Sequence, residues 1–495
     1  MSKNHLPVST ADVGYHYVQG DPAPRRFHRT FSQAFESVTA DHPILLDAVA
    51  IAEAVGCQAL IGDRTIVRDI KRTPWLSKIS PDCDSITDLP IPEHGQRRAS
   101  PEIIAVELVK ALRRELSDVA IGKKKIGILL SGGMDSRIVS AMLKSLQREG
   151  LECEVVAFCW GDPESRDPVY AKKIAEINEW QFEHLTIGPT TLANNIAVSA
   201  NQGCAFAANH LHAMPDVANR AKELGIECMI AASYGDSIGR AEYSGRHVDR
   251  LYPIEYRLHN TFQLLNPHLH EQLTRESLGA MDRYHQRFGN EPAIAITELD
   301  YQLHYMRNQL GTCMAVIEEK VPLFQAFTSL NVVRSMWSYH PDCRDDRVYA
   351  HVLNSLDPTL LEIPWARTGK RYLHNEDRPD ALRKRYHHYG TWCRHEIADQ
   401  IDQRIFSGEL EKTRLFDMKQ VEFLLKLNRK YCKTDNRNKF DEISLWLASF
   451  ASFLHGKDWA LDLSYIDNAK RPLTAYWPII RYASTYVLRR NKLNA

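Results

Sequence analysis

The chain has 495 residues, of which 44% are hydrophobic, so it has room for two or three domains with sizeable cores. Its 62 Lys and Arg residues balance its 62 Asp and Glu residues, and bulk charge therefore gives no support to nucleic-acid binding. The ten cysteines are scattered without a Cys-x-x-Cys pair, which argues against a zinc site or a disulfide framework and suits a reducing cytosol.

The first hundred residues carry few periodic signals. No apolar signal-peptide core follows Met1, and the apolar stretch 473–488 contains a proline and an arginine, so we expect a cytoplasmic protein without membrane contact. Residues 45–60 are apolar enough for a buried helix, and 62–65 indicate a turn into a short strand at 66–67. The composition of 90–98 is typical of a linker, which ends a first region at residues 1–98.

The middle of the chain alternates strand and helix signals. Ser100, Pro101 and Glu102 form the expected start of a helix that runs to about residue 116. Apolar runs predict strands at 126–130, 154–159, 182–187 and 228–232, with helical patterns between them. This alternation predicts an α/β fold, a doubly wound parallel sheet that binds ligands beyond the carboxyl ends of its strands. We place this domain at residues 99–375 and a largely helical region at 376–495.

Residues 126–137 form the most informative segment: a strand, a glycine turn and the start of a helix. Gly132 and Gly133 let the backbone approach a phosphate, which the free N–H groups and the helix dipole then face. Asp135 is placed where Mg²⁺ would bridge to the phosphate oxygens. A Walker A loop would require Gly-Lys-Ser/Thr, which is absent here. After the fourth strand, Gly235 and Asp236 could supply a second oxygen ligand for the same ion.

These motifs support a resemblance to known families. The run Ser-Gly-Gly-Met-Asp-Ser at 131–136 resembles the pyrophosphate loop of the ATP pyrophosphatases, which have the adenine nucleotide alpha hydrolase-like fold and cleave ATP between the α and β phosphates. Together with Glu-Glu-Lys-Val-Pro-Leu at 318–323 and the pair Arg367 and Lys370, it resembles the synthetase domain of glutamine-dependent asparagine synthetase over residues 100 to 375. The match has departures. Lys and Leu replace Arg and Phe around Val-Pro, the Arg–Lys spacing is one residue longer, and the loop at 235–239 matches only partly.

The resemblance implies a carbon–nitrogen ligase that forms AMP and pyrophosphate, with ATP and Mg²⁺ as cofactors. A small-molecule or peptide carboxylate would be adenylated and then transferred to ammonia or an amine, with asparagine biosynthesis as the default. By this resemblance the residues that bind the nucleotide and pyrophosphate are Ser131, Gly132, Gly133, Asp135, Ser136, Gly235 and Asp236. Asp135 and Asp236 would hold the metal, Glu318 would take the amine proton or position ammonia, and Lys370 would stabilise the adenylation transition state.

The N-terminal region resembles a truncated glutaminase domain. Residues 62–72 are similar to the tail of that domain, but Ser2 stands where the family exposes its catalytic cysteine, and the first cysteine is Cys57. We expect no glutaminase activity, so nitrogen would come from free ammonia, a separate glutaminase or an amine of the substrate. The last case is that of β-lactam synthetases and lasso-peptide cyclases, which close a ring.

Two other readings stay open beside the ligase. A tRNA-modifying branch of the same fold is opposed by the neutral charge and the isolated cysteines. A nucleotide-binding protein that has lost catalysis would explain the altered 235–239 loop. We expect no nucleic-acid partner, and a homodimer is compatible with the resemblance.

Overall fold

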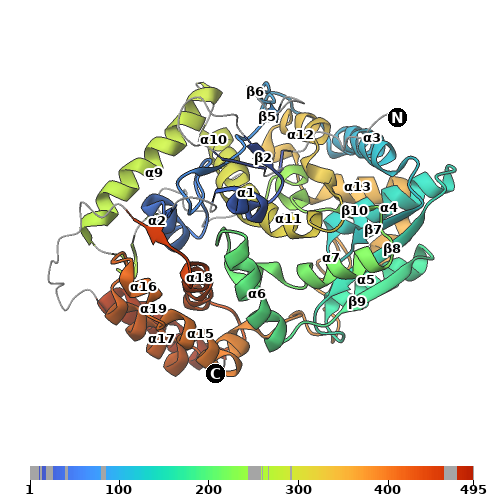
Figure 1. The fold of residues 1–495 in the computed structure, drawn as a ribbon. Helices are drawn as coiled ribbons and strands as arrows, with labels where there is room; N and C mark the ends of the chain where they lie inside the picture. The colour runs from blue at the N-terminus through green and yellow to red at the C-terminus, as the bar shows by residue number, and fades with distance from the viewer. Residues whose placement is uncertain are drawn as a thin grey trace.

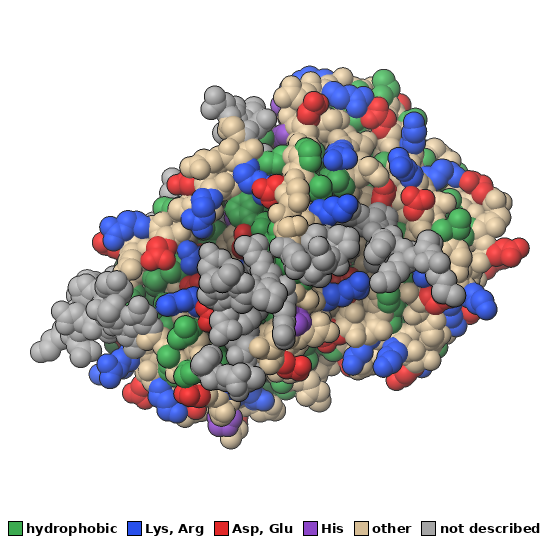
Figure 2. Space-filling model, turned by 45° about the horizontal axis from the view of Figure 1, so that its top comes forward, with side chains coloured by type: hydrophobic (Ala, Val, Ile, Leu, Met, Phe, Trp, Pro, Cys, Tyr) green, Lys and Arg blue, Asp and Glu red, His purple; other side chains and the backbone are tan. Residues whose placement is uncertain are grey.

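The computed structural model describes most of the chain, namely residues 10–11, 14–17, 26–38, 43–79, 85–242, 258, 260–265, 267–289, 293–461 and 476–493. Figure 1 shows a sheet with its helices on the right and a group of C-terminal helices at the lower left. Figure 2 shows Lys and Arg side chains interspersed with Asp and Glu on the face in view, as a balanced net charge requires. No described helix is long and apolar enough to span a bilayer.

A five-stranded parallel sheet forms the centre of the molecule. Its strand order is β11-β10-β7-β8-β9, and every neighbouring pair is parallel. The strands are β7 (Lys125–Leu129), β8 (Glu154–Trp160), β9 (Gln181–Leu185), β10 (Cys228–Ala231) and β11 (Leu323–Gln325). The chain moves outward from β7 to β9 and returns to the other side of β7 with β10. This order puts a topological switch point between β7 and β10, where α/β proteins bind ligands. The predicted α/β fold class is confirmed.

Helices cover both faces of this sheet, because its strands bury alternate residues in two cores. One face holds Ile126, Ile128, Val155, Ala157 and Ile230 against α3 (Pro101–Ala120), α4 (Met134–Arg148), α5 (Arg166–Ile177), α12 (Leu330–Trp337) and α13 (Asp346–Leu356). The other face holds Val156, Phe158, Met229 and Ala231 against α6 (Pro189–Asn201), α7 (Met214–Glu223) and α11 (Thr312–Glu318). A strand buried on both faces has a nearly continuous apolar sequence, which is why β7, β8 and β10 could be predicted.

The described part of the N-terminal region consists of short elements, three of which form a small antiparallel sheet. Its elements are β1 (Tyr15–Tyr17), β2 (Arg26–His28), α1 (Phe31–Val38), β3 (Ile44–Leu45), α2 (Ala48–Gly56), β4 (Ile70–Arg72), β5 (Ser77–Ile79) and β6 (Ile86–Asp88). The expected buried helix is α2, but the strand expected at 66–67 is a single bridge between Val67 and Leu46, and the strand proper is β4. β3 pairs in parallel with β12 (Trp459–Ala460), so this region is joined directly to the C-terminal part of the chain.

The rest of the chain is largely helical. A nearly continuous helical stretch consists of α10 (Ala293–Asp300), the wider π-helical segment η3 (Tyr301–Gly311) and α11; α9 (Pro267–Phe288) precedes it. After α13 the chain forms η6 (Pro358–Glu362), α14 (Tyr389–Thr391), η7 (Trp392–Glu396), α15 (Ala398–Ile405), α16 (Glu409–Lys412), α17 (Met418–Tyr431), α18 (Lys439–Leu454) and α19 (Trp477–Leu493).

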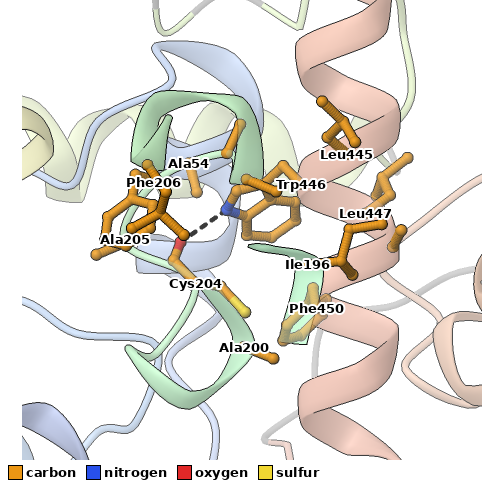
Figure 3. Packing of buried hydrophobic residues seen from close by; sticks show 14 of the residues in the cluster. Ala54, Ile196, Ala200, Cys204, Ala205, Phe206, Leu445, Trp446, Leu447 and Phe450 are labelled. Carbon is orange, nitrogen blue, oxygen red and sulfur yellow. Dashed lines mark hydrogen bonds between the residues drawn. The ribbon is translucent and has the colours of Figure 1, made fainter. Parts of the chain in front are cut away.

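The helix α18 is buried along almost its whole length and connects the C-terminal helices to the sheet domain. Trp446 packs against Ala54, Ala205 and Ile196, and its indole N–H donates to the Cys204 carbonyl at 2.8 Å (Figure 3). A tryptophan buried this deeply needs a partner for its N–H group, and the turn after α6 supplies one. The boundary at residue 375 stays a prediction, because one core spans the helices on both sides of it.

Candidate active site

The glycine turn between β7 and α4 collects backbone donors at the carboxyl end of the sheet. Gly133 is the N-cap of α4, and no side chain caps this helix. The Ser131 N–H donates to Ser136 Oγ, the Gly133 N–H to Ser131 Oγ and the Gly132 N–H to Asp167 Oδ1, each at 3.1 Å. These three side-chain oxygens accept hydrogen bonds from the backbone N–H groups of the turn. An anion bound at this uncapped helix N-terminus would accept hydrogen bonds from the same N–H groups. The loop residues named from the sequence are therefore brought together.

A cavity of about 340 Å³ opens in front of this turn. Ser131, Gly133, Asp135 and Ser136 form its floor, and its other walls come from β8, β10, η3, α11 and the segment before α14. These further lining residues are Leu129, Leu130, Cys159, Trp160, Asp167, His212, Met214, Ala231, Ala232, Ser233, Leu310, Met314 and Tyr386. Burial raises the pKa of Asp167 above its ordinary value, although the Gly132 N–H opposes that shift.

One wall of the cavity is made of flat rings. The rings of Trp160 and His212 stack with 6.1 Å between their centroids, and Tyr386 lies 5.7 Å from His212. His212 Nδ1 forms a hydrogen bond of 2.8 Å with the Tyr389 hydroxyl, and the Asn195 amide donates to the His212 carbonyl at 2.9 Å. Burial lowers the pKa of His212 well below its ordinary value, so the imidazole is uncharged. This wall can accept an aromatic heterocycle by stacking.

Two carboxylates face each other beside the turn. Asp135 is in the first turn of α4, and Asp236 belongs to the short π-helical turn η2 (Gly235–Gly239) that follows β10. The two segments touch so closely that a Cβ atom on Gly235 would lie 2.5 Å from Asp135 Oδ1. Burial, and then the charge of Asp135, raise the pKa of Asp236 to about 7, while burial raises that of Asp135 as well.

This acid pair fits a hard divalent cation. Asp135 Oδ1 is buried and accepts no hydrogen bond from the residues that the structure describes. Two close carboxylates destabilise each other's ionised forms, and a cation between them removes that penalty. Carboxylate oxygens are the ligands that Mg²⁺ prefers, and it usually completes its shell with water and substrate phosphates. Asp135 and Asp236 can therefore hold Mg²⁺.

Two arginines lie near the acids: Arg240, which the sequence reading missed, and Arg367, which it named only as part of the motif with Lys370. Arg240 is only 5% exposed, with Nη2 3.8 Å from Asp135 Oδ2 and Nη1 2.9 Å from Asp346 Oδ1. Arg367 Nη2 lies 2.9 Å from Glu242 Oε1, and both arginines lower the pKa of Asp135 and of Asp236. The one local signal for Arg240 was its place four residues after Asp236.

A third arginine fastens the turn to a distant segment. Arg137 follows the loop motif directly and is fully buried. Its guanidinium donates to the carbonyls of Leu360, Ile363 and Pro364 at 2.7 to 2.9 Å and to that of Gly132 at 3.2 Å. The Ala366 N–H also donates to the Gly132 carbonyl, at 3.1 Å. Arg137 is a charged residue on the side of α4 that is otherwise buried and apolar. That was the sequence signal available for this contact.

A second cavity, of about 300 Å³, meets the first at Asp135 and is also lined by Asp236. The two share Asp135, Ala232, Ser233 and Leu310. We call the second one the substrate chamber; its other lining residues are His210, Tyr234, Asp236, Tyr305, Met306, Gln309 and Cys313. Two ligands bound in these cavities would therefore meet beside Asp135 and Asp236.

Glu318 does not line either cavity, and its role with the amine stays a prediction. Met314 lines the first cavity, but α11 then runs away from it and ends at Glu318, whose charge acts on Cys228 at the start of β10. The physical reason is the direction of α11. A helix that leads into a parallel strand ends at the edge of the sheet where strands begin, opposite the ligand-binding edge.

Lys370 also lies outside both cavities. It closes a small hairpin in which the Trp365 N–H donates to the Lys370 carbonyl at 2.7 Å, and its Nζ donates to the Asn375 carbonyl at 2.5 Å. From the same segment, Arg367 is the residue whose charge reaches the acid pair. The assignment of the adenylation cation to Lys370 stays a prediction.

The likeness of this chain to the two solved structures named here is weak. The search of curated proteins finds no match. Among solved structures, the U34-tRNA thiolase NcsA from Methanococcus maripaludis with its 4Fe–4S cluster is 14% identical over 44% of this chain and 79% of that chain, with a TM-score of 0.22. The NMN synthetase from Francisella tularensis is 16% identical over 40% of this chain and 78% of that chain, with a TM-score of 0.21. Neither likeness is strong enough to bear on function.

The family model described as asparagine synthase matches residues 107–306. This range contains β7, β8, β9 and β10, the glycine turn and both acids, and it ends within η3 at Met306, one of the residues that line the substrate chamber. The recognition made from the sequence is confirmed for this range: residues 107–306 match the asparagine synthase model, and they contain four strands of the parallel sheet and the glycine turn at its switch point.

Proposed function

We propose that this protein is an ATP-dependent ligase that adenylates a carboxylate and then transfers the acyl group to ammonia or an amine. The observation that supports this proposal best is the junction of two cavities at Asp135 and Asp236. A reaction between ATP and a second substrate needs two binding spaces that meet at the α-phosphate, with positive charge available there.

The first cavity suits ATP. Its ring-lined wall, Trp160, His212 and Tyr386, can stack on the adenine, and the uncapped N-terminus of α4 can bind the phosphates. Asp135 and Asp236 would hold Mg²⁺, which when bound neutralises charge on the phosphates. The N–H groups of the turn would exchange their present oxygen acceptors for phosphate oxygens.

The substrate chamber suits the carboxylate. Its carboxylate oxygen would attack the α-phosphorus, and the bond to the β-phosphate would break with release of pyrophosphate. Arg240 and Arg367 are the cations of the described chain whose charge reaches this junction, and they would stabilise the negative charge that develops there. In the second step the amine nitrogen attacks the acyl carbon, and AMP leaves.

The experiment is carboxylate-dependent exchange of labelled pyrophosphate into ATP, run over a panel of carboxylic acids that includes aspartate. We expect exchange with at least one acid, AMP as the nucleotide product, and loss of exchange in Asp135→Ala. Asp118→Ala, which changes an exposed acid of α3, is the matched control and should retain exchange. Formation of ADP and phosphate, or full activity of Asp135→Ala, would contradict the proposal.

The source of nitrogen can be found with the same assay. Adding ammonium, glutamine or neither to the accepted acid distinguishes a free-ammonia ligase, a glutaminase-coupled ligase and an intramolecular cyclase by their products. ATP binding without exchange for any acid would support the reading as a nucleotide-binding protein that has lost catalysis.

A further inference from the structure

His212, on the ring-lined wall of the first cavity, has a strained backbone. It follows η1 (Ala208–Leu211) and precedes α7, and its φ of 49° with a ψ of −124° lies in a region that residues other than glycine rarely adopt. The Asn195 amide donates to its carbonyl at 2.9 Å and holds this turn from α6. Strained residues persist where their surroundings fix them, and they cluster at ligand sites. A strained histidine that lines a cavity is therefore a candidate for contact with the ligand.

The imidazole of His212 is held in one orientation by its neighbours. Its plane is 22° from that of Trp160, with 6.1 Å between the centroids, and its centroid lies 5.7 Å from those of Tyr386 and Tyr389. The Tyr389 hydroxyl lies 2.8 Å from Nδ1. The Tyr389 ring is in turn stacked on His387, with 4.1 Å between the centroids. Because the ring is fixed in this way, its second nitrogen has a defined direction.

The hydrogen bond with Tyr389 determines which nitrogen of His212 carries the proton. An uncharged imidazole has one donor and one acceptor nitrogen, and burial keeps this ring uncharged by lowering its pKa well below the ordinary value. Tyr389 is only 2% exposed, and His212 is the one partner of its hydroxyl among the described residues. A buried hydroxyl that donates to no acceptor is costly, so the phenol donates to Nδ1 and the ring proton lies on Nε2.

His212 Nε2 is therefore a donor that a ligand can reach. It has no hydrogen-bond partner among the described residues, yet it is not a buried atom, and the residue lines the first cavity. A hydrogen bond from a ring N–H lies near the plane of the ring. A base bonded to Nε2 would share the plane of His212 and would lie nearly parallel to Trp160, as stacking requires.

We propose that His212 recognises the base of the nucleotide by donating a hydrogen bond from Nε2 to a ring nitrogen of the adenine, while the adenine stacks on Trp160. This proposal rests on the proposed function and adds a specificity-determining residue to it. Stacking alone accepts every base, because every base has a π-face. A fixed donor distinguishes bases by the position of their acceptors.

The test uses analogues of ATP in which one ring nitrogen of the adenine is replaced by C–H. The full chain is titrated with Mg²⁺ and ATP, 1-deaza-ATP, 3-deaza-ATP or 7-deaza-ATP in isothermal titration calorimetry. One neutral hydrogen bond corresponds to about three- to tenfold in affinity, so one analogue should bind the wild-type protein more weakly than ATP by that factor. In His212→Phe, which keeps a flat ring without the donor, ATP and this analogue should bind equally.

Two further variants accompany this measurement. His212→Leu also lacks the donor and should abolish the same discrimination, so the result does not depend on how one side chain packs. His351→Phe makes the same replacement on α13, where the histidine is 40% exposed and lines neither cavity, and it should bind all four nucleotides as the wild-type protein does. Thermal melting verifies that each variant is folded at the temperature of titration.

The outcomes separate this proposal from the proposed function. If ATP binds but no carboxylic acid supports pyrophosphate exchange, the ligase function fails, and the titrations still decide the role of His212. If the wild-type protein binds every analogue as tightly as ATP, or if folded His212→Phe and His212→Leu discriminate against the analogues as the wild-type protein does, the assignment of His212 alone is overturned. The absence of ATP binding to the wild-type protein overturns both.

Discussion

Replacement of Gly235 by alanine should disable the acid pair while leaving the protein folded. A Cβ atom at this position would lie 2.5 Å from Asp135 Oδ1 and 2.7 Å from both Cβ and Cγ of Asp135. Ordinary van der Waals contact begins at 3.4 Å, and 3.4 − 2.5 leaves 0.9 Å by which the Asp135 carboxylate must move. Gly235 is outside the left-handed region of φ, so the effect comes from crowding and not from backbone strain.

The size of the effect follows from that displacement. A misplacement of about 1 Å in a reacting constellation costs roughly 10²-fold in rate. Overpacking by one methyl group costs about 1–3 kcal/mol, and domains of ordinary stability hold about 5–15 kcal/mol. We therefore expect about 10²-fold slower pyrophosphate exchange and a weaker rise in Tm on addition of Mg²⁺ and ATP, with a fall of only a few degrees in the Tm of the free protein.

Gly279→Ala is the matched control. This glycine lies inside α9, and a Cβ atom there would meet nothing within 4 Å. Alanine in a helix interior should stabilise the protein by about 0.5–1 kcal/mol and leave exchange unchanged. Wild-type exchange and a wild-type response to Mg²⁺ and ATP in Gly235→Ala would refute the reasoning, because the contact between the two acid-bearing segments would then have no part in the site.

Three further changes test other contacts. Burial and the charge of Asp135 raise the pKa of Asp236 from 3.8 to about 7, so the folded protein binds the proton more tightly than the unfolded chain, and stability should fall as the pH rises between these values. Mg²⁺ competes with that proton and should bind more tightly above pH 7. In Asp236→Asn, thermal unfolding with and without Mg²⁺ should show a weaker pH dependence both of stability and of Mg²⁺ binding. Wild-type pH dependence in this variant would contradict the assignment. Arg137→Met leaves four carbonyls without their charged donor and should lower the free energy of unfolding by more than about 3 kcal/mol in urea, whereas Arg113→Met, which breaks a surface ion pair, should cost less than about 1 kcal/mol. Glu318→Gln should keep both half-reactions, because its carboxylate lies at the far edge of the sheet, and a selective loss of amide formation would restore its catalytic assignment.

Local sequence patterns were sufficient to predict most strands of the sheet. Four strands could be predicted within one or two residues: β7, β8 and β10 because each is largely a continuous apolar run, and β9 because apolar residues are interspersed with polar ones along it. β11 has only three residues and follows Pro322 directly, so it carries no pattern of its own. It forms because Met229 and Ala231 of β10 offer a parallel edge on which Leu323 and Gln325 pair.

The site could be predicted only where its residues are contiguous. The turn at 131–136 and the segment at 235–236 each carry a motif within a few residues. Arg240 was missed, and Arg137 was missed although it follows the loop motif directly, because the partners that define it are carbonyls more than two hundred positions away. Glu318 was expected in the cleft for a different reason. Its motif was read without the direction of its helix, which the parallel sheet determines.

The contacts of the N-terminal region also show more than its sequence does. Its sequence resembles a truncated glutaminase domain, which suggests a region without a function of its own. In the structure, α2 is buried against the C-terminal helices, β3 pairs with β12, and Gln58 at the end of α2 holds the Glu442 carboxylate behind His210. A region in such contact with the back of the substrate chamber contributes to the shape of the site even without chemistry of its own. These contacts give the region a structural role that does not depend on any glutaminase chemistry.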